Sequence, residues 1–440
     1  MTYLLYFNDN VQKKESLNRK DGSFMKRLLI THLSQIATPA GSSLKTGKDM
    51  NDIRLLSDGA IYIEEEDIKL VGTTDQVLQY IGDARDCRII DGTGKCAVPG
   101  FVDSHTHFIF GGYRPQEFMA RLGGTGYLDI MKMGGGIQAS VNATRETGLE
   151  ELTALGRTRL SDMLSQGITT VEGKSGYGLD YSCEIKQLKA MKELNRLQPV
   201  DIVATYLGAH AVPAEYKGKV EEYIDFMIRK VLPAVKEENL AVFCDVFCED
   251  SVFSIDQSRR LLAAAKEKGF QIKIHADEIV NLGGGKLAGE LGAVSADHLL
   301  MTSEESIEAM KRNQVVATLL PNTAFCLNKS YAPARKIIDS GCGVALASDF
   351  NPGSCFSGSI PLMLALAAIH MKMTLNETLT AITLNGAAAL GLEKEIGSIE
   401  AGKKADINLL AFPSYEFLVY HTGSNVVEKV IKKGDLVFER

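Results

Sequence analysis

The chain has 440 residues, of which 45% are hydrophobic and 23% charged, and 48 Lys and Arg against 55 Asp and Glu give a net charge of −7. This composition is typical of a globular protein with enough length to bury a large core. The acidic balance predicts no broad basic surface, so neither nucleic acid nor an anionic membrane is an expected partner. No apolar run reaches the ~18 residues that a membrane-spanning helix needs.

The first 24 residues differ in character from the rest of the chain. A short apolar patch, Tyr3–Phe7, runs into charged Lys13-Lys14-Glu15 where a cleavage site would stand, so no secretory signal is predicted. We expect a cytoplasmic protein in which residues 1–24 form a loosely attached, poorly ordered extension, with Met25 as an alternative start. The eight cysteines form no CxxC pair, and we expect free thiols rather than a disulfide framework.

The two ends of the remaining chain, residues 25–96 and 395–440, have the sequence pattern of short strands separated by glycine-containing turns. The expected strands are Leu28–Thr31, Gly59–Ile63, Ile68–Val71, Arg88–Asp91, Asp406–Phe412, Val426–Ile431 and Leu436–Glu439. Neither end has enough strands to bury a hydrophobic core alone, so we expect one small β-sandwich domain built from both termini.

Between them, residues 97–394 alternate short apolar strands with helical stretches such as 254–268 and 303–312, the pattern of parallel βα units. The expected strands are Ala97–Asp103, Ile168–Glu172, Ile202–Leu207, Ala241–Phe247, Gln271–Ile274, Ala293–Asp297, Val315–Leu319 and Gly343–Ser348. Eight such units predict an α/β fold, a (β/α)8 TIM-like barrel.

Histidines gather where these strands end, which is where the functional groups of an α/β barrel lie. His105 and His107 follow the first strand, and His210, His275 and His298 follow the third, fifth and sixth. Residues i and i+2 of an extended segment point the same way, so His105 and His107 can present two imidazoles to one ion. With His275, and with Asp349 after the eighth strand, they form a donor set for one divalent ion, zinc or iron.

Such an ion with one open position lowers the pKa of a bound water and polarises a carbonyl. Asp349 is then placed to take a proton from that water, and Glu278 is a candidate proton shuttle to a leaving nitrogen. The alternative for Glu278 is a carboxylate at a helix start, stabilised by the helix dipole. His298 is expected to hydrogen-bond the developing oxyanion or to orient the water. The fourth strand exit, Phe247–Asp250, lacks the lysine that bridges two ions in some barrel hydrolases, which favours one ion.

Two side chains are candidate pocket walls. Arg114, on a glycine-rich bend after the histidine pair, suits a substrate carboxylate, although a surface arginine paired with Glu117 is the plainer interpretation. Tyr177, after the second strand, points to the barrel mouth or is an ordinary edge aromatic. Gly134-Gly135-Gly136 lacks the following Lys-Ser/Thr of a phosphate loop and suggests a mobile lid or a close backbone approach.

Several motifs together resemble the metal-dependent amidohydrolase superfamily, over nearly all of residues 26–440. Val98–His107 and Gly397–Asp406 are typical of the superfamily. More specific are His107–Arg114, Lys174–Leu179, Leu207–Ala211, His275–Glu278, Ser295–Leu299 and Ala347–Ser354, which resemble the enzymes that open imidazolone rings. Asn322, where glycine is more usual, and residues 1–24 depart from the pattern.

The resemblance implies a (β/α)8 barrel with a terminal β-sandwich and the hydrolysis of 4-imidazolone-5-propanoate to N-formimidoyl-L-glutamate in histidine degradation. It implies one zinc or iron ion held by His105, His107, His275 and Asp349, with Glu278, His298 and Asp349 as the catalytic groups. It implies substrate contacts by Arg114, Tyr177, His210, Glu278, Asn351, Gly353 and Ser354. The expected partner is a small-molecule substrate, and a homodimer is expected.

Two other functions share some of these features. A deaminase of a guanine- or cytosine-like ring also carries a His followed three residues later by Glu, but its neutral base has no carboxylate for Arg114 to bind. A catalytically silent assembly scaffold typically loses metal ligands, whereas all four are present here. Arg114→Ala distinguishes the first alternative, and metal analysis with an activity assay distinguishes the second.

Overall fold

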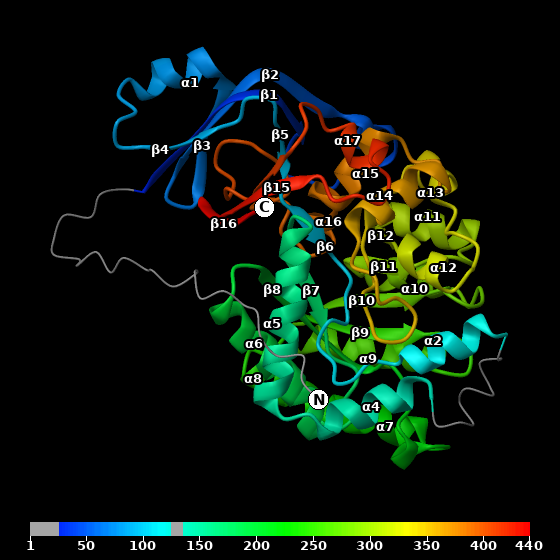
Figure 1. The fold of residues 1–440 in the computed structure, drawn as a ribbon. Coiled ribbons are helices and arrows are strands. Elements are labelled where there is room, and N and C mark those ends of the chain that lie inside the picture. Colours follow the sequence, from blue (N-terminus) through cyan, green and yellow to red (C-terminus); the bar gives the residue numbers. More distant parts are fainter. Residues whose placement is uncertain (1–25, 125–134) are drawn as a thin grey trace.

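The computed structural model describes residues 26–124 and 135–440, which contain two eight-stranded sheets (Figure 1). The extension predicted for residues 1–24 and the first residue of the predicted lid, Gly134, lie outside the described residues. All eight cysteines are free thiols, as predicted.

One sheet combines both ends of the chain, and Figure 1 shows its blue amino-terminal and red carboxy-terminal strands beside the barrel. The strand order is β16-β15-β14-β5-β1-β2-β3, and β4 pairs with β1. The strands are β1 (Arg27–Pro39), β2 (Ile53–Glu64), β3 (Asp67–Thr73), β4 (Arg88–Asp91), β5 (Cys96–Pro99), β14 (Ile407–Leu410), β15 (Val427–Lys432) and β16 (Asp435–Glu439). Ile30 and Ile61 share one buried cluster with Ile407 and Ile431, so the two ends of the chain do complete a common core.

One short helix in this part, α1 (Thr74–Ile81), was not predicted, because the pattern of residues 26–98 indicated strands throughout. The Thr73 side chain accepts a hydrogen bond from the Gln76 backbone, and the Gln76 side chain bonds back to the Thr73 backbone. This capping box satisfies backbone donors at the helix start. Val77 then packs into a small cluster with Leu29 and Tyr62. The Thr73–Gln76 spacing was the local signal for this helix.

The second sheet is an eight-stranded parallel sheet in chain order, which confirms the predicted (β/α)8 barrel. Its strands are β6 (Phe101–Asp103), β7 (Ile168–Lys174), β8 (Asp201–Ala209), β9 (Phe243–Cys248), β10 (Gln271–Ala276), β11 (Ser295–His298), β12 (Val316–Leu319) and β13 (Val344–Leu346).

The predicted first barrel strand, Ala97–Asp103, is wrong as a single strand. Its first half lies in β5, which pairs with β1 and β14 of the terminal sheet, and its second half is β6 of the barrel. The chain crosses between the sheets at Gly100, where a Cβ would overlap the Thr169 hydroxyl. Apolar periodicity cannot show which sheet a strand joins. The division into domains 25–96 with 395–440 and 97–394 stays a prediction.

Helices surround the barrel strands (Figure 1). They are α2 (Pro115–Leu122), α4 (Ile137–Glu146), α5 (Leu149–Ser165), α6 (Tyr181–Leu197), α7 (Val220–Phe226), α8 (Leu232–Glu237), α9 (Ile255–Glu267), α10 (Gly284–Leu291), α11 (Glu304–Arg312), α12 (Pro321–Cys326), α13 (Ala334–Asp339), α14 (Ile360–Ile369), α15 (Leu375–Ile382), α16 (Leu384–Ala388) and α17 (Phe417–Tyr420), with the short η1 (Gly47–Asn51), η2 (Ala214–Tyr216) and η3 (Met227–Val231). Ser254 and Ser303 cap α9 and α11, the two helices expected at 254–268 and 303–312.

The barrel closes between its first and last strands through residues just beyond them. The Asp349 amide donates to the His105 carbonyl over 3.0 Å, and the His107 amide donates to the Phe350 carbonyl over 2.9 Å. Below these bonds the Ser348 hydroxyl donates to the Asp103 carboxylate at 2.6 Å. Closure therefore brings three residues of the predicted metal set to one seam.

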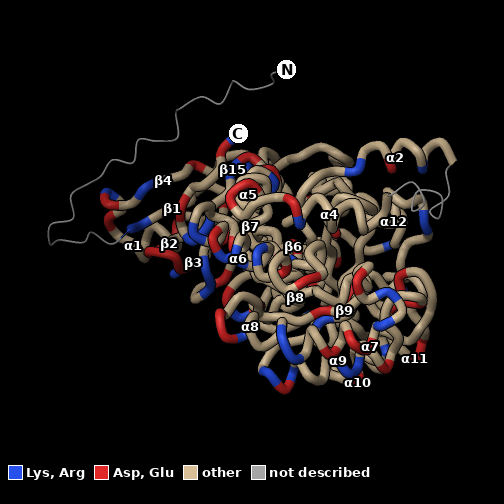
Figure 2. The backbone as a smooth tube through the Cα atoms, turned by 90° about the horizontal axis from the view of Figure 1, so that it is seen from below, with Lys and Arg blue, Asp and Glu red and all other residues tan. Residues whose placement is uncertain are grey.

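The charged residues are mixed along the chain, and Figure 2 shows Lys and Arg interspersed with Asp and Glu over the described backbone. Within residues 26–124 and 135–440, no helix combines the length and apolar character needed to cross a bilayer.

One buried ion pair joins the two sheets and provides a stability test. Lys432 of β15 has a side chain 3% exposed, and its Nζ lies 2.6 Å from Asp406 Oδ2 and 2.8 Å from Asp201 Oδ2. We predict that Lys432→Met destabilises the protein by about 3–5 kcal/mol, because Asp406 is left buried without its partner. The neighbouring Lys433, 38% exposed, also contacts Asp201, and Lys433→Met should cost less than about 1 kcal/mol. Thermal and urea midpoints measure both, and equal shifts would contradict the prediction.

Candidate metal centre

Three strand ends bring the predicted ligands together at one point inside the barrel mouth. His105 and His107 follow β6, His275 belongs to β10, and Asp349 follows β13. The Nε2 atoms of His107 and His275 lie 3.4 Å apart. Asp349 Oδ1 lies 3.6 Å from His105 Nε2 and 3.5 Å from His107 Nε2. All four side chains are at most 4% exposed.

These spacings fit a metal ion. Around a tetrahedral zinc with ligand distances of about 2.0–2.1 Å, neighbouring donor atoms lie about 3.3–3.4 Å apart. Burial, reinforced by neighbouring positive groups, lowers the pKa of His105 and of His107 well below the usual value, so both rings are neutral and offer lone pairs. His105 Nε2 is buried with no hydrogen-bond partner among the described residues, which leaves it available as a ligand.

Buried acidic side chains hold the other side of two of the histidines. Asp297 Oδ2 lies 2.6 Å from His105 Nδ1, and Asp245 Oδ2 lies 2.9 Å from His275 Nδ1. A carboxylate that accepts the Nδ1 proton directs the free Nε2 lone pair to the centre and increases its basicity. The hydrogen bond to Asp297 therefore sets the tautomer and the orientation of His105, and Asp245 lies within ion-pair distance of His275.

Asp349 is oriented by its other oxygen and by its backbone. The Thr323 hydroxyl donates to Asp349 Oδ2 over 2.7 Å, which leaves Oδ1 facing the histidines. Burial raises the pKa of Asp349 to about 6, although the Thr323 hydrogen bond opposes the shift. Its φ of 53° lies in the left-handed region, an uncommon conformation for a non-glycine residue that often accompanies functional sites.

Glu278 and His298 lie beside this centre. His298 Nε2 is 3.6 Å from Glu278 Oε2, and the His298 ring is 5.2 Å from that of His275. Burial raises the pKa of Glu278 to about 8, so this carboxyl group holds a proton at neutral pH. Its alternative as a helix-start carboxylate is not what the structure shows, because α10 begins six residues later and Asp277 accepts from the Gly284 amide there.

Two aromatic side chains form a wall above His107. The His210 ring stacks on His107 with centroids 4.9 Å apart, and His210 Nδ1 lies 3.0 Å from the Gly176 carbonyl. The Tyr177 ring lies 5.3 Å from His210 and is 3% exposed, so it is a buried wall rather than a surface-edge aromatic. Burial lowers the pKa of His210 to about 3, which keeps this ring neutral.

Arg114 pairs with Glu117, and its binding of a substrate carboxylate stays a prediction. Its Nη1 lies 3.2 Å from Glu117 Oε2, which is the plainer interpretation. Its side chain is nevertheless only 13% exposed, and it lies against Gly353 so closely that a Cβ there would overlap the guanidinium. Arg114 therefore reaches the loop after Asp349.

That loop is organised by Asn351. Its Oδ1 accepts hydrogen bonds from the amides of Gly353 and Ser354, each at 2.8 Å, and its Nδ2 donates to the Asp349 carbonyl at 2.7 Å. Asn322, where glycine was expected, donates to the Ser357 carbonyl at 3.4 Å and so connects α12 to the same loop.

Sequence reasoning assigned no role to five buried charged residues beneath the histidines, namely Glu172, Lys174, Asp245, Lys273 and Asp297. The sequence did indicate their position inside the barrel, because they alternate with other inward-facing residues along the strands. Lys273 stands two residues before His275, and Glu172 two before Lys174, so each pair faces the barrel interior. Charged residues inside apolar strands are rarely buried without partners.

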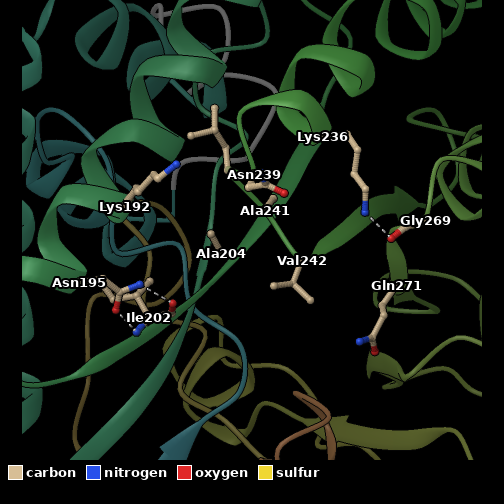
Figure 3. Close-up of a pocket in the computed structure, with 11 residues that line it drawn as sticks. Lys192, Asn195, Ile202, Ala204, Lys236, Asn239, Ala241, Val242, Gly269 and Gln271 are labelled. Atoms are coloured by element: carbon tan, nitrogen blue, oxygen red, sulfur yellow. Dashed lines mark hydrogen bonds between the residues drawn. The ribbon is translucent and has the colours of Figure 1, made fainter.

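A cavity of about 380 Å³ lies at the opposite ends of the barrel strands (Figure 3). It is lined by residues at the starts of β8 and β10, among them Ile202 and Gln271. Two of its polar side chains bond to backbone groups, Asn195 to the Ile202 carbonyl and Lys236 to the Gly269 carbonyl. The predicted catalytic residues lie at the other end, so we place no chemistry in this cavity.

Comparisons with known proteins show the family of the chain. A model of the amidohydrolase family matches residues 96–437. The chain is 54% identical over 410 residues to imidazolonepropionase from Parabacteroides distasonis, covering 93% of this chain and 98% of that one. It is 53% identical to imidazolonepropionase from Clostridium tetani, covering 94% and 98%.

Solved structures show the same fold at low identity. Guanine deaminase from E. coli has a TM-score of 0.72 at 15% identity, covering 94% of this chain and 99% of that one. A mutant atrazine chlorohydrolase from Arthrobacter aurescens, complexed with zinc and atraton, has a TM-score of 0.68 at 17% identity, covering 94% and 95%.

We predict that Thr323→Val weakens metal retention by about 10-fold or more, because an unanchored Asp349 carboxylate loses its orientation. Competition with a chelator measures the effect. Thr318→Val is the matched control, since the Thr318 hydroxyl is also buried but has no hydrogen-bond partner among the described residues. Equal metal retention in both variants would contradict the role of Thr323.

Proposed function

The chain belongs to the amidohydrolase family, and we propose that it hydrolyses 4-imidazolone-5-propanoate to N-formimidoyl-L-glutamate in histidine degradation. The observation that carries the proposal is the donor set of His107, His275 and Asp349 at 3.4–3.5 Å spacing, completed by His105. The identity of 54% to an imidazolonepropionase over 93% of the chain supports the choice of substrate.

We propose that His105, His107, His275 and Asp349 hold one ion, zinc or iron. Bound there, the ion would supply a water of near-neutral pKa and would polarise the substrate carbonyl. The exit of β9, Phe247–Cys248 followed by Glu249, offers no lysine to bridge a second ion. Asp349 accepts the proton of the attacking water.

Proton transfer to the leaving ring nitrogen is assigned to Glu278. Its raised pKa keeps it protonated at neutral pH, and an acid with a pKa near the working pH is the most effective donor. His298, which burial keeps neutral, hydrogen-bonds the oxyanion that develops on the ring carbonyl. The 3.6 Å between His298 Nε2 and Glu278 Oε2 supports the assignment of both groups to one reacting bond.

The propanoate tail is assigned to the wall formed by Tyr177 and His210. Arg114 binds its carboxylate, with Tyr177 and His210 beside it, and Asn351, Gly353 and Ser354 lie near the product. The planar guanidinium suits a carboxylate, and the buried position of Arg114 strengthens the interaction. Holding the tail fixes the ring at contact distance from the attacking water.

We also propose that the protein is a cytoplasmic homodimer that binds neither nucleic acid nor membranes. The net charge of −7 and the mixed charges of Figure 2 support the absence of a nucleic acid partner.

We predict that the metal-replete protein consumes imidazolonepropanoate and that His275→Ala abolishes this activity, because one of the four proposed ligands is lost.

Arg114→Ala should lower kcat/KM by about 10–100-fold while metal stays bound, because a charge-assisted hydrogen bond to the tail is lost. Arg157→Ala, an exposed arginine on α5, is the control. Full activity of Arg114→Ala would contradict the assignment of Arg114 to the tail carboxylate. It would favour the alternative substrate, a neutral ring without a carboxylate.

The pH profile tests Glu278. A group that donates a proton must be protonated, so with a pKa of about 8 we predict that kcat/KM falls above pH 8. Glu278→Gln should lower kcat by about 10²–10⁴-fold and remove this basic limb. A variant that keeps the same limb would assign it to another group.

A further inference from the structure

A second layer of charge lies beneath the candidate metal centre, inside the barrel. Glu172, Lys174, Asp245, Lys273 and Asp297 all have side chains 0% exposed. In the candidate metal centre Asp297 orients His105 and Asp245 lies beside His275, but the proposed function uses neither lysine. Lys174 also belongs to the motif Lys174–Leu179, whose tyrosine alone was assigned a role.

The lysines are tightly bound within this layer. Lys174 Nζ lies 2.8 Å from Glu172 Oε1 and 2.7 Å from Asp245 Oδ2. Lys273 Nζ lies 2.7 Å from Glu172 Oε2 and donates to the Ser104 carbonyl at 2.8 Å. Both ammonium groups lie 3.7 Å from the same atom, Asp297 Oδ2.

The acidic groups around the lysines have the arrangement of a second metal site, called here the lower site. Ligand atoms of His105, Glu172 and Asp297 all lie within 4.8 Å of one another. His105 faces both layers, because its Nε2 lies near Asp349 and its Nδ1 lies 2.6 Å from Asp297 Oδ2. Three buried carboxylates without compensation would strongly attract a cation, since buried charges are costly unless they are paired.

We propose that the ammonium groups of Lys174 and Lys273 take the place of a cation in this lower site and thereby restrict the protein to one metal ion. Two positive charges against three carboxylates leave one negative charge. His105 Nδ1, 2.6 Å from Asp297 Oδ2, and the Ser295 hydroxyl, which donates to Asp297 Oδ1 at 2.6 Å, stabilise this charge. The lysines are therefore positioning residues that determine the metal stoichiometry.

This inference deepens the proposed function, because the upper site, formed by His105, His107, His275 and Asp349, is the metal centre of that proposal. Its test does not depend on activity. Metal-free protein is incubated with excess Mn²⁺, desalted and analysed for Mn²⁺ per chain by mass spectrometry, and electron paramagnetic resonance detects coupled ion pairs. Mn²⁺ is the probe because carboxylates and imidazoles both bind it.

The unaltered protein should hold one Mn²⁺, and Lys273→Ala should hold two, because the vacated space is surrounded by carboxylates. Lys174→Ala opens the same site from β7 and serves if Lys273→Ala does not fold, as judged by circular dichroism. Lys286→Ala is the matched control, since Lys286 is 43% exposed and pairs with Glu305 on the surface. Adding Glu172→Gln to Lys273→Ala should return the count to one, because a ligand of the lower site is removed.

Folded lysine variants that hold one Mn²⁺, or an unaltered protein that holds two, would overturn the proposal. A purely structural role for the lysines would lower thermal stability without changing the ion count. If the unaltered protein holds no ion and Lys273→Ala holds one, the lower site is supported and the proposed function fails instead.

Discussion

The hydrogen bonds that close the barrel are the constraint on which the candidate site depends. The Asp349 amide bonds to the His105 carbonyl, so joining the first strand to the last also joins two of the proposed ligands. The Asp103–Ser348 bond spans 245 residues of sequence and supports the same seam. A change that opens the barrel here would separate the donor atoms, which need spacings of only a few ångströms to share an ion.

Burial is the second organising effect, and it acts differently on each group. It keeps His105 and His107 neutral, so that their lone pairs are available, and it keeps Glu278 protonated as an acid. The same burial raises the pKa of Asp297, whereas His275 and Lys174 hold the pKa of Asp245 well below its usual value despite burial. The barrel interior is therefore a layered polar assembly, with the proposed proton donor and the proposed metal ligands in one layer and the buried lysines and carboxylates in the layer beneath them.

Much of this was predictable from local sequence. The histidines at strand exits, the eight strands and the two-ended β structure are consequences of periodicity and residue type. The split of Ala97–Asp103 and the role of Asp245 and Asp297 could not be predicted in this way, because both depend on which strands are neighbours. Helix α1 was not predicted, although the Thr73–Gln76 spacing of its capping box is present in the sequence.

The residue types and their spacing determined which chemistry was available, since imidazoles and carboxylates at strand ends can share a metal ion where those ends meet. Folding in three dimensions settled the rest. It brought Asp297 to His105 and Thr323 to Asp349, placed both lysines below the histidines, and set the pKa values by burial. These are effects of contacts between residues far apart in the chain, and no local pattern of the sequence contains them.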